Sequence, residues 1–194
     1  TLNVASTETF NQVIVNKNAI LNLAEINGKL VAAETTNMGT INVGKAATLE
    51  STILTNDGVA DKKPVDGIID VVYGSYVKTQ TNDITGIIQY TLTNDTKAFQ
   101  INNLVNAVAE KTARVNTLVI PADITLDLNA VDKDAILDPY TGVNMSEKLK
   151  SLENVDIVID GGKLIGDMSK NYKVKNVIAR TLTNQIKQIT AKNI

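Results

Sequence analysis

Apolar and polar residues alternate along several short stretches of this chain, and the alternation predicts β-strands. Residues 155–160 are the clearest case, because they divide into two faces: Val155, Ile157 and Ile159 on one, and Asp156, Val158 and Asp160 on the other. A period of two is typical of a half-buried strand. Gly161-Gly162 comes next and allows a positive φ. We therefore expect the chain to turn a corner here and to continue along a new side at Lys163-Leu164-Ile165.

Apolar positions predict further strands of three to six residues elsewhere in the chain. The positions that indicate them are Leu21 and Leu23, Ile41 and Val43, Leu49, and Ile124, Leu126 and Leu128. The chain also contains 22 Asn and 22 Thr but only three Pro. Thr favours strands, and Asn tolerates the left-handed backbone of tight turns. This composition fits many short strands joined by tight corners.

Short sequence matches recur at intervals of roughly 20 to 30 residues, which is the range of solenoid repeats. Residues 15–21 match residues 43–49 as V-x-K-x-A-x-L, and residues 120–126 form a looser copy. A second pattern begins at residues 152, 174 and 186, and two further matches join 26–31 to 159–165 and 67–69 to 86–88. Together they predict coils that stack on one another.

One segment has helical spacing instead. Apolar residues at Ile101, Leu104, Val105 and Val108 predict an amphipathic helix near residues 98–113, with Asp95 or Thr96 as its N-cap. Because the ends of a solenoid need caps, this helix is a candidate for a capping or inserted element.

The order of these elements resembles a known architecture. "AFQINNLVNAVAEKTARVNTLVIPADITL", residues 98–126, is similar to the opening of pectate-lyase-like right-handed parallel β-helix proteins, and "LENVDIVIDGGKLIGD", residues 152–167, is similar to their coils. The similarity is best over residues 98–194. It implies an all-β, right-handed parallel β-helix. An antiparallel β-sandwich is the alternative, because Asn27-Gly28 and Asp57-Gly58 are typical hairpin pairs.

We expect residues 1–194 to form a single β-solenoid domain that is a fragment of a longer chain. The last residues, Ala191-Lys192-Asn193-Ile194, lie within a strand-like repeat. An open strand edge invites association. Either a longer protein continues the coils, or this open solenoid end pairs with a partner by self-association.

Charge and composition remove several classes of function. Lys and Arg total 19 against 21 Asp and Glu, and only Arg114 and Arg180 are arginines, so the sequence indicates no nucleic-acid partner. It has no run of apolar residues long enough for a membrane-spanning helix, so we expect no membrane insertion. The chain has no Cys and no His, which excludes thiol and imidazole catalysis, disulfides and the usual zinc sites.

The residues that could form a catalytic, metal or phosphate site each have a plain structural role as well. Asp156 and Asp160 share a strand face but lie about 13 Å apart, too far to hold one ion. Asp132, Asp134 and Asp138 begin like a calcium loop but lack its later Gly and Glu. Gly161, Gly162 and Gly166 lack a phosphate-binding pattern, and Asn94 and Asn144 match glycosylation sites that chance explains. We predict no catalytic, cofactor or metal residues, and no cofactor.

Two further sets of residues are candidates for ligand contacts. Lys17 and Lys45 occupy equivalent places in the V-x-K-x-A-x-L repeat, so they are candidates for a ligand-binding ladder or for solvated turns. Tyr73, Tyr76 and Tyr90 cluster in the middle of the chain. Strand alternation sends Tyr73 and Tyr76 to opposite faces, so packing in the core or at a coil edge is the predicted role.

Three functions remain, and the first is the favoured one. It is a non-catalytic, adhesin-like or carbohydrate-contacting β-helix module on the bacterial surface or secreted, with surface polysaccharide or host glycan as its partner. The second is a polysaccharide lyase that uses Asp156 or Lys163, the only enzyme class that the composition leaves plausible. The third is a structural segment of a larger filamentous surface protein. All three place the chain outside the cell or on its surface.

Overall fold

The computed structural model describes residues 1–72, 75–81, 84–92, 116–127, 151–165 and 173–180. The described residues are all-β and contain no helix. They belong to two compact units, one that includes Thr1–Tyr90 and one that includes Asn116–Ile194. The predicted helix at 98–113 and the last residues, 181–194, lie outside the described part of the chain.

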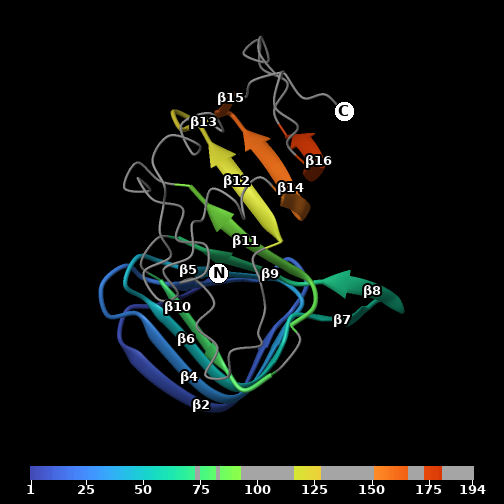
Figure 1. The fold of residues 1–194 in the computed structure, drawn as a ribbon. Coiled ribbons are helices and arrows are strands. Elements are labelled where there is room, and N and C mark those ends of the chain that lie inside the picture. Colours follow the sequence, from blue (N-terminus) through green and yellow to red (C-terminus); the bar gives the residue numbers. More distant parts are fainter. Residues whose placement is uncertain (73–74, 82–83, 93–115, 128–150, 166–172, 181–194) are drawn as a thin grey trace. The chain divides into compact units, whose positions relative to one another are not determined.

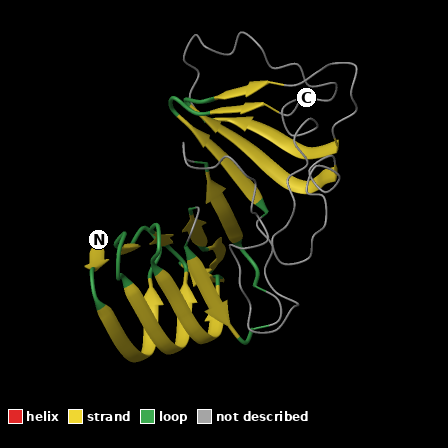
Figure 2. Ribbon diagram, turned by 60° about the vertical axis from the view of Figure 1, so that its left-hand side comes forward, coloured by secondary structure: helices red, strands yellow, loops and turns green. Residues whose placement is uncertain are grey.

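The first unit is a parallel β-helix in which the chain winds through two stacks of strands in turn (Figures 1 and 2). The first stack has the order β1-β3-β5-β9-β11, and the second has the order β10-β6-β4-β2. All of their pairings are parallel. The first stack contains β1 (Leu2–Val4), β3 (Ile20–Leu23), β5 (Thr40–Val43), β9 (Ile68–Val71) and β11 (Ile87–Thr91). The second contains β2 (Thr7–Val15), β4 (Lys29–Asn37), β6 (Thr48–Thr55) and β10 (Tyr76–Thr79).

The parallel fold was predicted correctly, and the sandwich alternative was wrong. Asn27-Gly28 belongs to the corner between β3 and β4, which are in different parallel stacks, and not to a hairpin. Asp57-Gly58 does begin a hairpin, made of β7 (Asp57–Ala60) and β8 (Lys63–Asp66), but the turn of that hairpin lies at Asp61-Lys62. The hairpin is an insertion in one coil, and a local turn signal cannot distinguish such an insertion from a sheet of hairpins.

Each coil contributes the same positions to the interior. Residues stacked in register have partners 19, 20, 28 and 19 residues further along, as in the row Leu2, Leu21, Ile41, Ile69 and Ile88. Leu21, Ile41, Ile69 and Ile88 are buried, whereas Leu2, in the first coil at the end of the stack, is exposed. Burial of these aliphatic rows removes apolar surface from water, which is the main stabilising term for such a stack.

The long strands of the second stack bend, which gives each coil three sides (Figure 1). The pairing of β4 with β6 is continuous up to Ala32 and Ser51 and starts again at Glu34 and Ile53. Ala33 and Thr52 are left out of the pairing and lie at the bend. Both of those residues are exposed. The expected strand length of three to six residues was therefore too short, because β2 and β4 each join two sides in nine residues.

The V-x-K-x-A-x-L match describes a corner and not a coil. Asn18, Ala46 and Asp123 all have a left-handed φ, of 66°, 61° and 67°. Each is followed by a residue whose N–H donates to a carbonyl three residues earlier: Ala19 to Asn16 at 2.9 Å, Ala47 to Gly44 at 2.9 Å, and Ile124 to Pro121 at 3.2 Å. The corner at 16–19 leads from β2 to β3, whereas the corner at 44–47 leads from β5 to β6. The 28-residue interval is therefore about one and a half coils.

The second unit has the same parallel construction. Its larger sheet has the strand order β12-β14-β16, and β13 pairs with β15 beside it, all in parallel. The predicted corner is confirmed at Gly161, whose φ is 84°. Ile157 and Ile159 are buried, as the alternation predicts, but Val158, which the alternation placed on the opposite face with Asp156 and Asp160, is buried too, so both faces of the strand are covered at this point. Leu118 and Ile120, which pair in register with Ile157 and Ile159, are also buried. These strands are β12 (Thr117–Pro121), β13 (Thr125–Asp127), β14 (Ser151–Asp160), β15 (Lys163–Ile165) and β16 (Lys173–Ala179).

Candidate functional site

The outer face of the second stack carries an exposed aromatic side chain among polar ones. We define the Tyr76 platform as Lys29, Thr48, Glu50, Tyr76 and Lys78. Register places Lys29, Thr48 and Tyr76 in one row across β4, β6 and β10, and places Glu50 and Lys78 side by side in the next row. Strands lie about 4.8 Å apart and alternate residues about 6.7 Å apart. The platform therefore has about the area of one or two sugar rings.

The strand period explains why these side chains face outward. In β10 and β6 the alternate residues Val77 and Leu49 are buried in the interior, so Tyr76 and Lys78 on one strand and Thr48 and Glu50 on the other face away from it. Tyr76 retains 40% of its exposed surface. A ring held this way on a sheet presents an apolar face and a polar tip to solvent.

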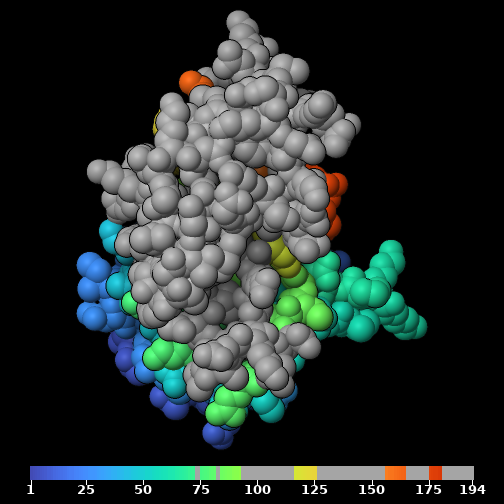
Figure 3. All heavy atoms as spheres, in the orientation of Figure 1, coloured from blue at the N-terminus to red at the C-terminus, as the bar shows by residue number. Residues whose placement is uncertain are grey.

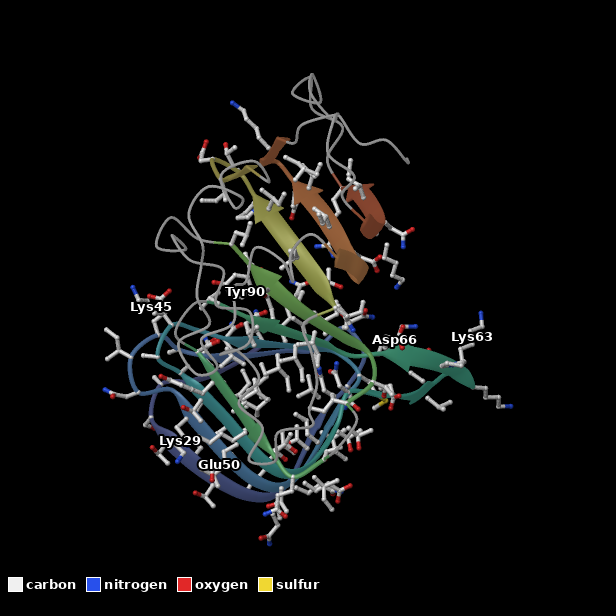
Figure 4. All side chains as sticks on the ribbon, viewed as in Figure 1. Lys29, Lys45, Glu50, Lys63, Asp66 and Tyr90 are labelled. Atoms are coloured by element: carbon white, nitrogen blue, oxygen red, sulfur yellow. The ribbon has the colours of Figure 1, made fainter. Side chains whose placement is uncertain are left out.

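An ion pair occupies the centre of the platform. Lys29 Nζ lies 3.0 Å from Glu50 Oε2, and the two side chains are 38% and 40% exposed. Figure 4 shows both of them on the outside of the bent sheet. An exposed pair of this kind contributes about 0 to 1 kcal/mol to stability. Its groups therefore remain able to exchange hydrogen bonds with a polar ligand at little cost.

A second polar feature crosses the outer face of the first stack, but its groups are used internally. Asn22 Nδ2 donates to Asn3 Oδ1 at 2.8 Å, and Asn42 Nδ2 donates to Asn22 Oδ1 at 2.7 Å. Further along the same row, Gln89 Nε2 donates to Asp70 Oδ2 at 2.7 Å. Side chains that satisfy one another from coil to coil stabilise the stack, so this amide row is assigned a structural role.

The acidic residues singled out in the second unit, Asp156 and Asp160, do not form a metal site. Asp156 Oδ1 accepts from Asn176 Nδ2 at 2.7 Å, and Asp156 Oδ2 lies 3.3 Å from Lys175 Nζ. Asp160 lies on the same strand, four residues further along. Across the described segments, no cluster of three or more acidic residues is arranged to hold a metal ion.

The structure also places the candidate lysines and two of the candidate tyrosines. Lys17 and Lys45 are exposed at two different corners, one between β2 and β3 and one between β5 and β6, so they do not stack as a ladder, and the alternative of exposed turn positions is the one that fits. Tyr90 is fully buried, as predicted, but Tyr76 is exposed, contrary to the packing role expected for it. Asp132, Asp134 and Asp138, as well as Tyr73, Asn94, Asn144 and Gly166, lie outside the described residues.

Sequence reasoning missed the amide row and the exposed position of Tyr76. An apolar-Asn-apolar triplet opens three coils, at Leu2-Asn3-Val4, Leu21-Asn22-Leu23 and Ile41-Asn42-Val43. That signal was available in the sequence. The position of Tyr76 required the register of β10 on β6, which no local pattern supplies.

The described residues define a parallel β-helix that carries the Tyr76 platform on the outer face of its second stack. No protein-family model, curated protein or solved structure matches the chain. Within the described ranges, no helix has the length and apolar character that a membrane span requires.

Proposed function

We propose that this chain is a non-catalytic module of the pectate-lyase-like β-helix type that contacts carbohydrate on a bacterial surface or as part of a secreted, adhesin-like protein. The observation that carries the proposal is the exposure of Tyr76 beside Lys29, Glu50 and Lys78 on a regular strand face. Sugar recognition commonly combines an aromatic ring, on which the apolar face of the sugar stacks, with polar groups that meet its hydroxyls. The platform provides both kinds of group on one side of the solenoid.

The platform is held rigidly, which favours binding. The backbone N–H of Tyr76 donates a hydrogen bond to the Ala47 carbonyl at 3.0 Å, and β10 pairs with β6 over four residues. A ligand that meets a preformed surface loses less free energy to ordering the protein. Modest affinity per site, multiplied over several copies on a surface, suits an adhesin.

Replacing the ring should abolish most of the binding. We expect Tyr76→Ala to weaken binding to the glycans that bind the wild-type protein on an array by about fivefold or more, because the stacking contribution of an aromatic ring is about 1 kcal/mol or more. Isothermal titration with the best array ligand measures the change. Ile53→Ala is the matched control, since Ile53 is 54% exposed on the same sheet beyond the bend.

Three outcomes would contradict the proposal. An equal loss of glycan affinity in Tyr76→Ala and Ile53→Ala would mean that the glycan binds elsewhere. An absence of glycan binding by the wild-type protein would favour a structural segment of a larger filamentous surface protein. Calcium-dependent turnover of acidic polysaccharide, lost in Asp156→Asn or Lys163→Gln, would replace the binding module by a lyase.

A further inference from the structure

The hairpin β7–β8 is an insertion that the coil does not need. The chain leaves the coil at Asn56 and returns at Gly67, whose N–H donates to the Asn56 carbonyl at 2.9 Å. The coil that contains it is 28 residues long in register, whereas the other coils of the first stack have 19 or 20. Figures 1 and 3 show the hairpin projecting beyond the strands of the first unit. The hairpin therefore adds surface without closing the solenoid.

The base of the hairpin is fixed to the coil. Gly58 lies against the Met38 side chain so closely that a Cβ would be 2.6 Å from its Cγ and Sδ. Thr85 Oγ1 donates to the Asp57 carboxylate. A two-stranded hairpin is only marginally stable alone, so these contacts orient it.

The tip of the hairpin combines two costly features. Asp61 and Lys62 both have a left-handed φ, 53° and 63°, in a two-residue turn where Asn-Gly is the favoured pair. Val59 is 68% exposed. Backbone strain kept on a projecting element is typical of a functional contact, and the coil gives no structural reason for either feature.

The two edges of the hairpin are not equivalent. In a two-residue turn the closing pair, Ala60 and Lys63, is hydrogen-bonded, so the next pair, Val59 and Pro64, is not. The N–H and C=O of Val59 therefore point away from β8, while Pro64 has no N–H to offer on its own side. Proline is a common means of blocking an edge strand. Among the described strands none pairs with β7 except β8, so the β7 edge is the one that accepts a further strand.

The charges on β7 and in the adjoining turn indicate which kind of partner strand can pair with this edge. Asp57 and Asp61 lie on either side of Val59, and the cations Lys62 and Lys63 belong to the far side of the turn and to β8. A second copy paired antiparallel about Val59 would bring its Asp61 opposite Asp57, and like charges placed opposite one another destabilise a strand pair. We propose that the β7 edge binds an extended segment of another protein in which two cationic residues flank an apolar residue that packs on Val59. This inference is independent of the glycan-binding proposal.

A synthetic peptide, Gly-Lys-Thr-Val-Thr-Lys-Gly, tests the proposal against the whole chain. We expect it to shift the amide resonances of Asp57 to Ala60. We expect the peptide with both Lys replaced by Glu to bind about tenfold more weakly, because the favourable charge contacts with Asp57 on β7 and with Asp61 in the adjoining turn both become repulsive. Equal affinity of the two peptides, no binding by either, or concentration-dependent pairing of the chain through β7 would each overturn it.

Two variants separate edge pairing from loss of the hairpin. Val59→Pro removes an N–H that points outward and replaces the side chain on which the peptide valine packs, whereas the bonds from β7 to β8 remain, so the hairpin still forms but the peptide no longer binds. Asp61→Asn keeps a residue that tolerates the left-handed turn and should weaken binding by about threefold through the lost charge pair. Unchanged affinity in Asp61→Asn would contradict the charge argument even if Val59→Pro unfolded the hairpin.

Discussion

Gly86→Ala should lower the free energy of unfolding by about 4 kcal/mol or more, a loss that single substitutions cause only through severe strain or core disruption. Gly86 has a φ of 78°, where a Cβ costs about 1 to 2 kcal/mol on its own. A Cβ at this position would also lie 2.0 Å from the Asn56 carbonyl oxygen and 3.0 Å from that of Gly67. Both are backbone atoms of the adjoining coil, so the coils would have to separate. Chemical denaturation followed by circular dichroism measures the loss.

Gly58→Ala is the matched control for this prediction. Its added Cβ meets Met38 Cγ and Sδ, which belong to a flexible side chain and not to the backbone, and its φ is not left-handed. Methionine adapts to such intrusions, so we expect a change of about 1 kcal/mol or less. A similar cost in the two variants would show that the close packing at Gly86 does not hold the coils in register.

Part of the fold followed from the sequence because its signals are local. The alternation around Ile157 and Ile159 and the corner at Gly161 needed only the period of two and the conformational freedom of glycine. The match of 67–69 to 86–88 was a true coil repeat, since Ile68 and Ile69 pair in register with Ile87 and Ile88. These features are set within one strand or one turn, where sequence and backbone conformation are directly linked.

The coil length did not follow, because two different features imitate it. Corners of the same conformation occur both where the chain enters the first stack, between β2 and β3, and where it leaves that stack, between β5 and β6, so Lys17 and Lys45 match in sequence without stacking in space. The hairpin then lengthens one coil to 28 residues, the same interval as the corner match. Only the pairing of strands distant in sequence distinguishes the recurring corner from the coil that the hairpin lengthens.

The candidate site was harder to predict than the fold for a related reason. Tyr76 and Glu50 lie on neighbouring strands but 26 positions apart in the chain, in a coil lengthened by the hairpin. The outward direction of Tyr76 depends on the register that buries Val77 over Leu49. A slip of one residue would have buried the ring instead.

Asn56→Ala should cost about 3 kcal/mol of folding free energy, the second largest effect that we expect, because it leaves buried polar groups without partners. Asn56 is fully buried at the point where the hairpin joins the coil. Its Nδ2 donates to the Gly67 and Ile87 carbonyls at 3.0 and 3.2 Å, and its Oδ1 accepts from Asn37 Nδ2 at 2.8 Å. One side chain therefore connects three successive coils. Denaturant unfolding of the variant measures the loss.

Asn42→Ala and Asn56→Asp make the test specific. Asn42 is half-buried on the outer amide row, where water can replace the lost bonds, so its truncation should cost about 1 kcal/mol or less. Asn56→Asp keeps the shape and the acceptor but, when ionised, has no donor for the two carbonyls, so it should be at least as destabilising as Asn56→Ala at neutral pH. Burial disfavours the charged form and raises the folded-state pKa of the introduced carboxyl, so this loss should shrink as the pH falls and protonation restores a donor. A loss independent of pH, or equal to that of Asn42→Ala, would mean that the donor bonds from Asn56 do not hold the coils together.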